Sequence, residues 1–237
     1  MIKEVNEFFS KLDQINCWVD GSGVEHFPFQ WTPTEFLEFA ENDLKQKGPQ
    51  AAANALANAK RALDCQLDYF LKTYGLSQIA TNLRWTTSSK ISLMDDLGIV
   101  PQSIFHKVNK ARNDLEHRYD LPSVLTAENS IEIVGIFVAA TDMYLFPARI
   151  STYYEIKEGQ GGLTAPLLAE LQLVLLEGDT IGAKGKIHAL SFDYQISSET
   201  NLSDYLYLLT FILHSHRINT PSATKFFHKL KYVFPKS

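Results

Sequence analysis

The chain has very little cysteine and none of the common short motifs for metals or nucleotide phosphates. Only Cys17 and Cys65 occur among its 237 residues, too few for a disulfide framework or for a zinc site built from thiolates. Walker loops, glycine-rich dinucleotide loops, zinc-protease helices and hydrolase nucleophile elbows are absent from the sequence. The sequence therefore predicts no metal site and no bound cofactor.

Long hydrophobic runs are also missing. The most apolar long stretch, from Ile131 to Phe146, contains Asp142 and is too short and too charged to span a bilayer. Hydrophobic residues make up 45% of the chain and charged residues 21%, which is typical of a packed globular protein. The first residues include early acids and lack the apolar core of a signal peptide. We therefore expect a soluble, cytoplasmic protein with no membrane partner.

Positive charge is in short supply overall, because the net charge is −5. The first 40 residues hold two lysines and seven acids, whereas the remainder is close to neutral. The total argues against a protein that coats nucleic acid through bulk charge, but it allows contact at a small basic site. After Asp204 the chain has no further acid and five basic residues interleaved with aromatic ones. This tail either binds single-stranded nucleic acid or packs its aromatic rings on the core, with the lysines in water.

Helical signals dominate the first 148 residues. Helices are expected to begin at Pro33, at Pro49 and at Pro101, with a short one ending near Gly98 and a last one from about Thr126 to Phe146. The apolar residues of these segments recur at steps of three and four, as they do on a helix with one buried face.

The pattern changes beyond residue 148. Residues 151–157 are β-branched and aromatic, as in a strand, and residues 171–176 and 181–196 are typical of a hairpin, with a helix expected from Leu202 to His214. The sequence thus predicts a mainly α protein. A helical bundle over residues 1–148, into which an acidic segment of residues 1–32 leads, is followed by a small C-terminal α+β unit over residues 149–237.

One helical segment has a pattern that is typical of a catalytic site. Arg112 is followed directly by Asn113, His117 lies five residues after the arginine, and Tyr119 lies two residues further on. This resembles the Arg-x4-His-x-Tyr signature of the HEPN superfamily (higher eukaryote and prokaryote nucleotide-binding), including the polar residue after the arginine. The resemblance implies a bundle of four or five helices with the motif between the last two long ones, an arrangement that the helices expected over residues 33–148 supply.

The resemblance also implies an activity. HEPN proteins with an intact motif are typically metal-independent ribonucleases, in which two bundles form a homodimer and share one composite site. By this resemblance His117 acts as acid or base in the attack of the RNA 2′-hydroxyl, and Arg112 stabilises the phosphate. A toxin–antitoxin or antiviral-defence role is implied as well, with a separate antitoxin or nucleotidyltransferase chain as a partner that modifies Tyr119.

Further side chains of the segment have supporting roles in this interpretation. Asn113 is an i, i+4 neighbour of His117 and can orient it, while Asp114 or Glu116 can tune it. The candidate RNA-binding residues are Lys107, Lys110 and Arg118.

Three other interpretations stay open. Arg112–Glu116 and Asp114–Arg118 are i, i+4 pairs of opposite charge, so the segment can also be an ordinary solvated helix face. The bundle can be a non-catalytic module that binds a nucleotide or a protein partner. Residues 149–237 can carry the main function, for example by sensing a ligand.

Overall fold

The computed structural model describes residues 3–10, 14–21, 26–46, 48–105, 108, 110, 121–145, 150–158, 166–176 and 179–218. The chain divides into two compact units. The first, here called the sheet unit, comprises Met1–Val24, Tyr74–Ile79 and Pro147–Ser237, and the second, the helical unit, comprises Glu25–Thr73 and Ala80–Phe146. In the sequence, most of the helical unit is therefore an insertion between two parts of the sheet unit.

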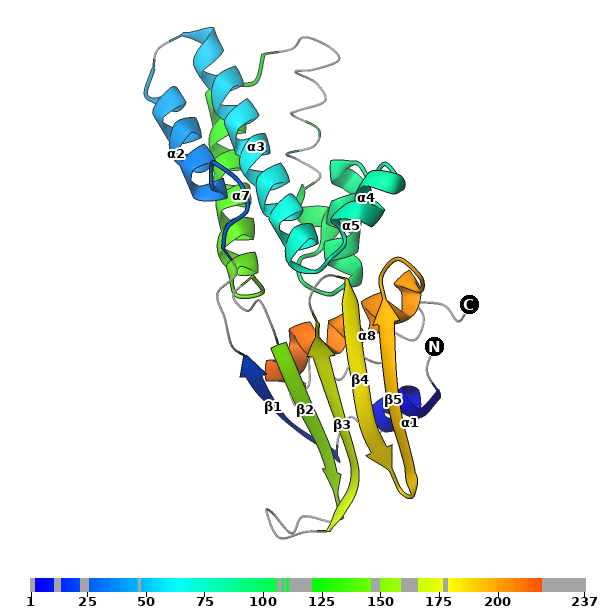
Figure 1. Cartoon of the computed structure of the whole chain (residues 1–237). Helices are drawn as coiled ribbons and strands as arrows, with labels where there is room; N and C mark the ends of the chain where they lie inside the picture. The colour runs from blue at the N-terminus through cyan, green and yellow to red at the C-terminus, as the bar shows by residue number, and fades with distance from the viewer. Residues whose placement is uncertain are drawn as a thin grey trace. The chain divides into compact units, whose positions relative to one another are not determined.

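The helical unit contains the helices predicted from Pro33, from Pro49, before Gly98 and before Phe146 (Figure 1). A short helix at Ser77–Asn82 was not predicted, and the residues directly after Pro101 form a 3-10 helix where an α-helix was expected. Its described elements are α2 (Pro33–Leu44), α3 (Pro49–Thr73), the end of α4 (Ser77–Asn82), α5 (Thr87–Asp96), the short 3-10 helix η2 (Gln102–Phe105) and α7 (Val124–Asp142). The expected starts at Pro33 and Pro49 are confirmed, and the last predicted helix begins two residues earlier and ends four residues sooner than expected. Residues 111–120 of the helix expected after Pro101 lie outside the described residues.

Local capping explains where these helices begin. Thr32 and Glu35 form a capping box ahead of α2, with Pro33 in the first turn. The Ser123 hydroxyl caps α7 by accepting a hydrogen bond of 3.1 Å from the backbone N–H of Thr126. Gly48 has a φ of 126°, which a residue with a side chain rarely adopts, immediately before α3 begins.

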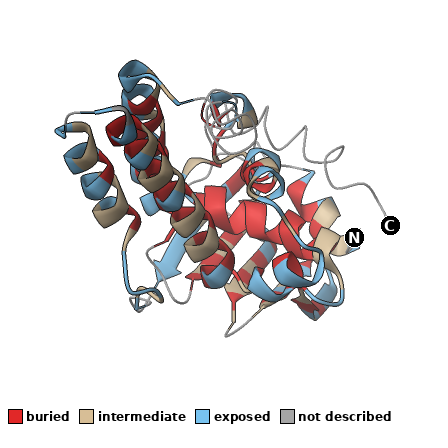
Figure 2. Ribbon diagram, turned by 90° about the horizontal axis from the view of Figure 1, so that it is seen from above, coloured by how far each residue is buried: buried red, intermediate tan, exposed pale blue. Residues whose placement is uncertain are grey.

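Small side chains allow α2, α3 and α7 to pack closely. A buried cluster joins the three helices, and its members are Ala40, Ala52, Ala55, Ala59, Ala127 and Ile131. Buried Gln66 of α3 donates hydrogen bonds to Thr141 Oγ1 (2.8 Å) and Asp142 Oδ1 (3.0 Å) of α7. Figure 2 colours the buried residues of these helices red and the exposed residues on their solvent-facing sides pale blue. Close apolar contact therefore joins the three helices, and the Gln66 hydrogen bonds join α3 to α7.

Helix α7 is also the only described helix that is long and apolar enough, by length and composition, to cross a membrane. A core helix of a packed protein passes the same test. Here α7 packs against α2 and α3. The absence of a membrane partner stays a prediction.

The sheet unit corrects the predicted fold class. Its strands are β1 (Ile15–Gly21), β2 (Ile150–Lys157), β3 (Leu167–Leu175), β4 (Thr180–Ile187) and β5 (Leu190–Ser197). In the described residues they form one antiparallel sheet in the order β1-β2-β3-β4-β5 (Figure 1). The prediction of a helical bundle followed by a small α+β unit is therefore wrong, because a five-stranded sheet is a large part of the fold.

Two segments of the chain differ from the expectation. The acidic N-terminal segment was expected only to lead into the bundle, but it contains α1 (Lys3–Phe9) and β1, and β1 pairs with β2. The stretch 181–196 was expected to be one arm of a hairpin, but the chain turns at His188, whose φ is 54°, and forms both β4 and β5.

One face of the sheet is covered by α1 and by α8 (Leu202–His214), with the short helix η4 (Ser215–Arg217) after it. The Tyr154 hydroxyl of β2 donates to the Phe211 carbonyl of α8 at 2.8 Å, and the Phe9 ring of α1 stacks on the Phe211 ring at 3.5 Å. The segment 74–79 is tied in as well, since the Tyr205 hydroxyl donates to the Tyr74 carbonyl at 2.7 Å. We call this the inner face and the opposite one the outer face.

Gly185 marks a close approach between strands on the inner face. A Cβ atom at this position would lie 2.5 Å from the Glu170 carbonyl oxygen and 2.7 Å from the Phe192 ring. At Gly182, also on β4, the nearest atom would be 3.7 Å away, which is ordinary contact.

The Gly185→Ala variant is therefore expected to lose about 1–3 kcal/mol of stability, because the backbone or the ring has to move. The Gly182→Ala variant is expected to unfold at nearly the temperature of the parent protein. Thermal unfolding of the two variants checks the strand packing, and equal effects of both would contradict it.

Candidate functional sites

The predicted catalytic residues fall in the part of the chain that the structure leaves undescribed. This holds for Lys107, Arg112, Asn113, Asp114, Glu116, His117, Arg118 and Tyr119. Lys110 is described, is helical and is exposed, and Val108 nearby is buried. Whether the motif side chains converge therefore stays a prediction. The structure describes residues on either side of the motif: Val108 and Lys110 before it, and Leu121 to Ser123, where α7 is capped, after it.

A polar hollow of about 410 Å³ lies in the helical unit, with Val108 on its wall. Its lining residues come from α3, from the start of α5 and from the turn before it: Lys60, Leu63, Asp64, Asp68, Trp85, Thr86, Thr87, Ser88, Lys90 and Val108. Val108 stands four positions before Arg112 in the sequence. The hollow is thus lined in part by a residue close in sequence to the motif.

The charges in this hollow are paired. Lys60 forms an ion pair of 2.8 Å with Asp64, and Lys90 pairs with Asp68. The Thr87 hydroxyl donates to the second Asp64 oxygen at 2.7 Å. Thr86, Thr87 and Ser88, at the start of α5, complete the polar lining. The Thr-Thr-Ser-Ser-Lys composition of residues 86–90 is the sequence signal of this polar lining.

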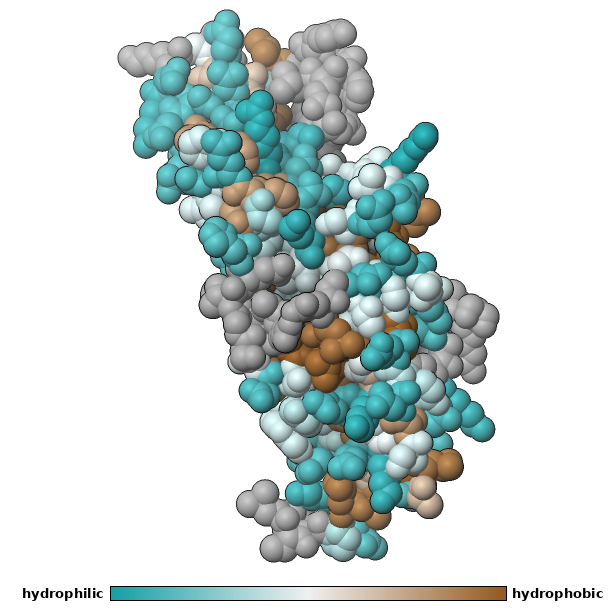
Figure 3. Space-filling model, viewed as in Figure 1, coloured by the Kyte–Doolittle hydropathy of each residue, from teal (hydrophilic) through white to brown (hydrophobic). Residues whose placement is uncertain are grey.

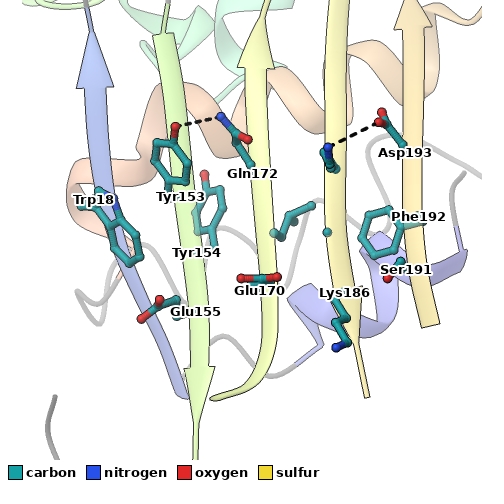
Figure 4. A pocket seen from close by; sticks show the side chains of 13 residues that line it. Trp18, Tyr153, Tyr154, Glu155, Glu170, Gln172, Lys186, Ser191, Phe192 and Asp193 are labelled. Atoms are coloured by element: carbon teal, nitrogen blue, oxygen red, sulfur yellow. Dashed lines mark hydrogen bonds and ion pairs between the residues drawn. The ribbon is translucent and has the colours of Figure 1, made fainter. Parts of the chain in front are cut away.

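A second concave region, a groove of about 460 Å³, lies on the outer face of the sheet (Figure 4). Strand register builds it from two rows of side chains that run across the strands. The first row is Trp18, Tyr153, Gln172, Lys184 and Asp193, and the second is Glu155, Glu170, Lys186 and Ser191. In Figure 4 these side chains stand on the near face of the sheet while α8 crosses behind it. The groove therefore belongs to the sheet unit alone.

An aromatic pair forms one wall of this groove. The rings of Trp18 and Tyr153 are nearly parallel, at 8°, with centroids 5.6 Å apart. The Gln172 side-chain amide donates to the Tyr153 hydroxyl at 2.9 Å and holds that ring in place. Trp18 is nevertheless 46% exposed, which is unusual for so large an apolar side chain.

Charged side chains cover the rest of the groove. Glu155 is paired with Lys157 at 3.2 Å, and Lys184 meets Asp193 only at 4.0 Å, with both side chains largely exposed. Figure 3, viewed from the same side as Figure 1, shows mostly hydrophilic side chains over the sheet, with separate apolar patches.

Glu170 and Lys186 lie opposite each other in the register of β3 and β4. Among the described residues neither of them is within 4.0 Å of an oppositely charged group.

The two cysteines are poor candidates for a nucleophile. Burial raises the pKa of the Cys17 thiol to about 12. Burial, together with the nearby Asp68 and Asp64 carboxylates, raises the pKa of the Cys65 thiol to about 11. The thiolate is the reactive form, so both side chains are largely unreactive near neutral pH. In the described part of the chain, no group of three or more His, Cys, Asp or Glu side chains is placed to hold a metal ion.

No family model, no curated protein and no solved structure matches the chain. The resemblance to the HEPN superfamily therefore rests on the motif residues and on the order of the helices around them.

Thiol labelling tests the assignment of the cysteines. At pH 8 roughly one thiol in a thousand or fewer is ionised at a pKa of about 11 or above. We expect both cysteines of the folded protein to react with an aromatic disulfide at least about a hundredfold more slowly than glutathione does. Denaturant should restore the ordinary rate. Fast labelling of either cysteine in the folded protein would show a nucleophile that the structure does not account for.

Proposed function

We propose that the protein is a metal-independent endoribonuclease of the HEPN type. The observation that carries this proposal is the spacing of Arg112, Asn113, His117 and Tyr119. It is supported by their place in the helical unit, between buried Val108 and the capped start of α7. A toxin or phage-defence role in the cytoplasm, with a separate antitoxin or nucleotidyltransferase chain as partner, belongs to the same proposal.

RNA supplies its own nucleophile for such a reaction. A base removes the proton of the 2′-hydroxyl, the 2′-oxygen attacks the adjacent phosphorus, and the bond to the 5′-oxygen breaks as an acid protonates that oxygen. The products are a 2′,3′-cyclic phosphate and a 5′-hydroxyl. An imidazole titrates near neutral pH and can serve in either role. The Arg112 guanidinium presents a fixed positive fork to the phosphate oxygens as charge develops on them.

The single histidine of the motif cannot act as base and acid in the same step. In a homodimer whose motifs face one cleft, His117 removes the proton and His117 of the partner subunit protonates the leaving oxygen. Asn113, four residues before His117, orients the ring, and Asp114 or Glu116 tunes it. Lys107, Lys110 and Arg118 attract the RNA backbone.

In this proposal RNA also contacts the hollow that Val108 lines, four positions before Arg112 in the sequence. Its hydroxyl groups and the N-terminus of α5 offer hydrogen-bond donors to a phosphate. Its lysines are already paired with Asp64 and Asp68, so it adds little net positive charge. We therefore assign the charge-dependent part of RNA binding to the motif segment.

Cleavage in EDTA tests the chemistry. Purified protein is incubated with an unstructured RNA, and the product ends are analysed for a 2′,3′-cyclic phosphate and a 5′-hydroxyl. His117→Ala should lower the rate about 10²–10⁴-fold through loss of the acid or base. Arg112→Ala should lower it about 10²–10³-fold through loss of charge stabilisation.

Two exposed residues of the helical unit provide matched controls. His26→Ala and Arg61→Ala remove the same chemical groups outside the motif sequence and should cleave like the parent protein. Equal rates for the parent and both motif variants would refute the mechanism. RNA binding without any cleavage would instead identify the chain as a non-catalytic binding module.

The composite site makes a separate prediction about stoichiometry. Light scattering should give twice the chain mass of 26.8 kDa under conditions in which the protein cleaves RNA. Titration of His117→Ala chains into a fixed amount of parent protein should lower its activity, because mixed dimers hold one imidazole. His26→Ala chains added in the same way should not lower it. A monomer at full activity would contradict the shared site.

A further inference from the structure

The groove on the outer face of the sheet offers a stacking surface. Trp18 is the outermost aromatic side chain of its row because β1 is the edge strand, and its ring is 46% exposed. Tyr153 supports it in a parallel stack, and Gln172 fixes the tyrosine hydroxyl. A ring that is exposed and also held in one orientation is what a planar ligand group needs for stacking.

Hydrogen-bonding groups lie next to this surface. The Glu170 carboxylate, in the neighbouring row, is not matched by a cation within 4.0 Å among the described residues. A carboxylate accepts hydrogen bonds from amino groups, such as those on the edges of adenine, guanine and cytosine. In duplex RNA these edges are paired or hidden in a groove that side chains do not reach, whereas in a single strand they are open.

Positive charge lies on the far side of the groove. Lys184 and Lys186 are on β4, two strand spacings or about 10 Å from Tyr153 on β2. Both are exposed, and the one partner of Lys184 in the described residues is 4.0 Å away. The groove thus places an aromatic pair and a carboxylate on one side and two weakly engaged ammonium groups on the other (Figure 4).

We infer that this groove binds a short segment of single-stranded RNA. A base stacks on the Trp18–Tyr153 pair, its amino edge faces Glu170, and the adjacent phosphate lies near Lys184 and Lys186. The three acids of the groove offset its lysines, so it holds a few nucleotides by stacking and does not track a long polyanion. The inference rests on the proposed function only in that both concern RNA. The groove lies in the sheet unit, so RNA binding there can be tested independently of cleavage.

Binding is measured with the His117→Ala chain, which keeps the RNA intact if the proposed cleavage occurs. A labelled, unstructured oligonucleotide of about ten residues is titrated by fluorescence anisotropy at several salt concentrations. Trp18→Ala should weaken binding about tenfold or more through loss of stacking. Lys186→Ala should weaken it less and should reduce the slope of log K against log salt by about 0.7.

Matched variants separate this site from general effects. Trp31 is 43% exposed in the helical unit, so Trp31→Ala removes a tryptophan of similar exposure and should leave binding unchanged. Lys3→Ala removes an exposed lysine from α1, on the inner side of the same unit, and should also bind like the parent protein. Unchanged unfolding temperatures of the variants show that they are folded.

The outcomes distinguish this inference from the proposed function. Loss of binding in Trp18→Ala and Lys186→Ala supports the groove even if the parent protein cleaves no RNA. Unchanged RNA binding in both variants overturns the inference that the groove binds RNA, even if His117-dependent cleavage is found. Binding of a neutral oligosaccharide, together with no measurable affinity for RNA, also overturns it and assigns the aromatic pair to sugar binding.

Discussion

The pairing of β1 with β2 is the interaction on which the rest of the structure depends. Gly21 pairs with Ile150 and Ile15 with Ile156, although the whole helical unit lies between these strands in the sequence. Closing a loop of this length costs roughly 4 kcal/mol of chain entropy beyond a constant term. Burial of β2, α1 and α8 on the inner face, with Tyr154, Phe9 and Phe211 in contact, supplies the compensating free energy.

The same pairing creates the groove on the outer face. Trp18 meets Tyr153 only because β1 adds to the edge of the sheet in this register, and a shift by one residue would turn Trp18 to the other face. In the sequence, both ends of the helical unit are joined to segments of the sheet unit. The proposed catalytic chemistry and the inferred RNA contact therefore belong to separately folded parts of one chain.

Local sequence signals predicted the starts of α2 and α3, because such signals are short-range, whereas the short helices α1 and α4 were not predicted. Thr32 and Glu35 form the capping box that the Thr-Pro-Thr-Glu sequence suggests, and Gly48-Pro49 separates α2 from α3 as expected. Strand β1 was not predicted, because Ile-Asn-Cys-Trp-Val-Asp-Gly does not alternate clearly between apolar and polar residues. Its strand character depends on a partner 129 positions away, which no local pattern encodes.

For the candidate sites too, local sequence patterns reveal only residues that are close together in the sequence. The HEPN-like motif is contiguous, so it could be found in the sequence, whereas Trp18, Glu170 and Lys186 come from three different strands and become neighbours only through register. The turn at His188 lacks the glycine or asparagine that usually marks a positive φ, so the sequence pattern does not separate β4 from β5.

Division of the charges by unit refines the expectation about RNA. The sheet unit contains 11 basic and 12 acidic residues, and the helical unit contains 11 basic and 15 acidic residues. Neither unit is basic as a whole, so RNA contact has to arise at small sites where cations lie together.

Photo-crosslinking of a uridine-analogue RNA to the His117→Ala chain, with the attached peptides identified by mass spectrometry, tests this account most directly. We expect crosslinks in two places, the motif segment from Lys107 to Tyr119 and the peptides that carry Trp18 or Lys186. Crosslinks that fall on neither, or that are spread evenly over the exposed lysines, would contradict it.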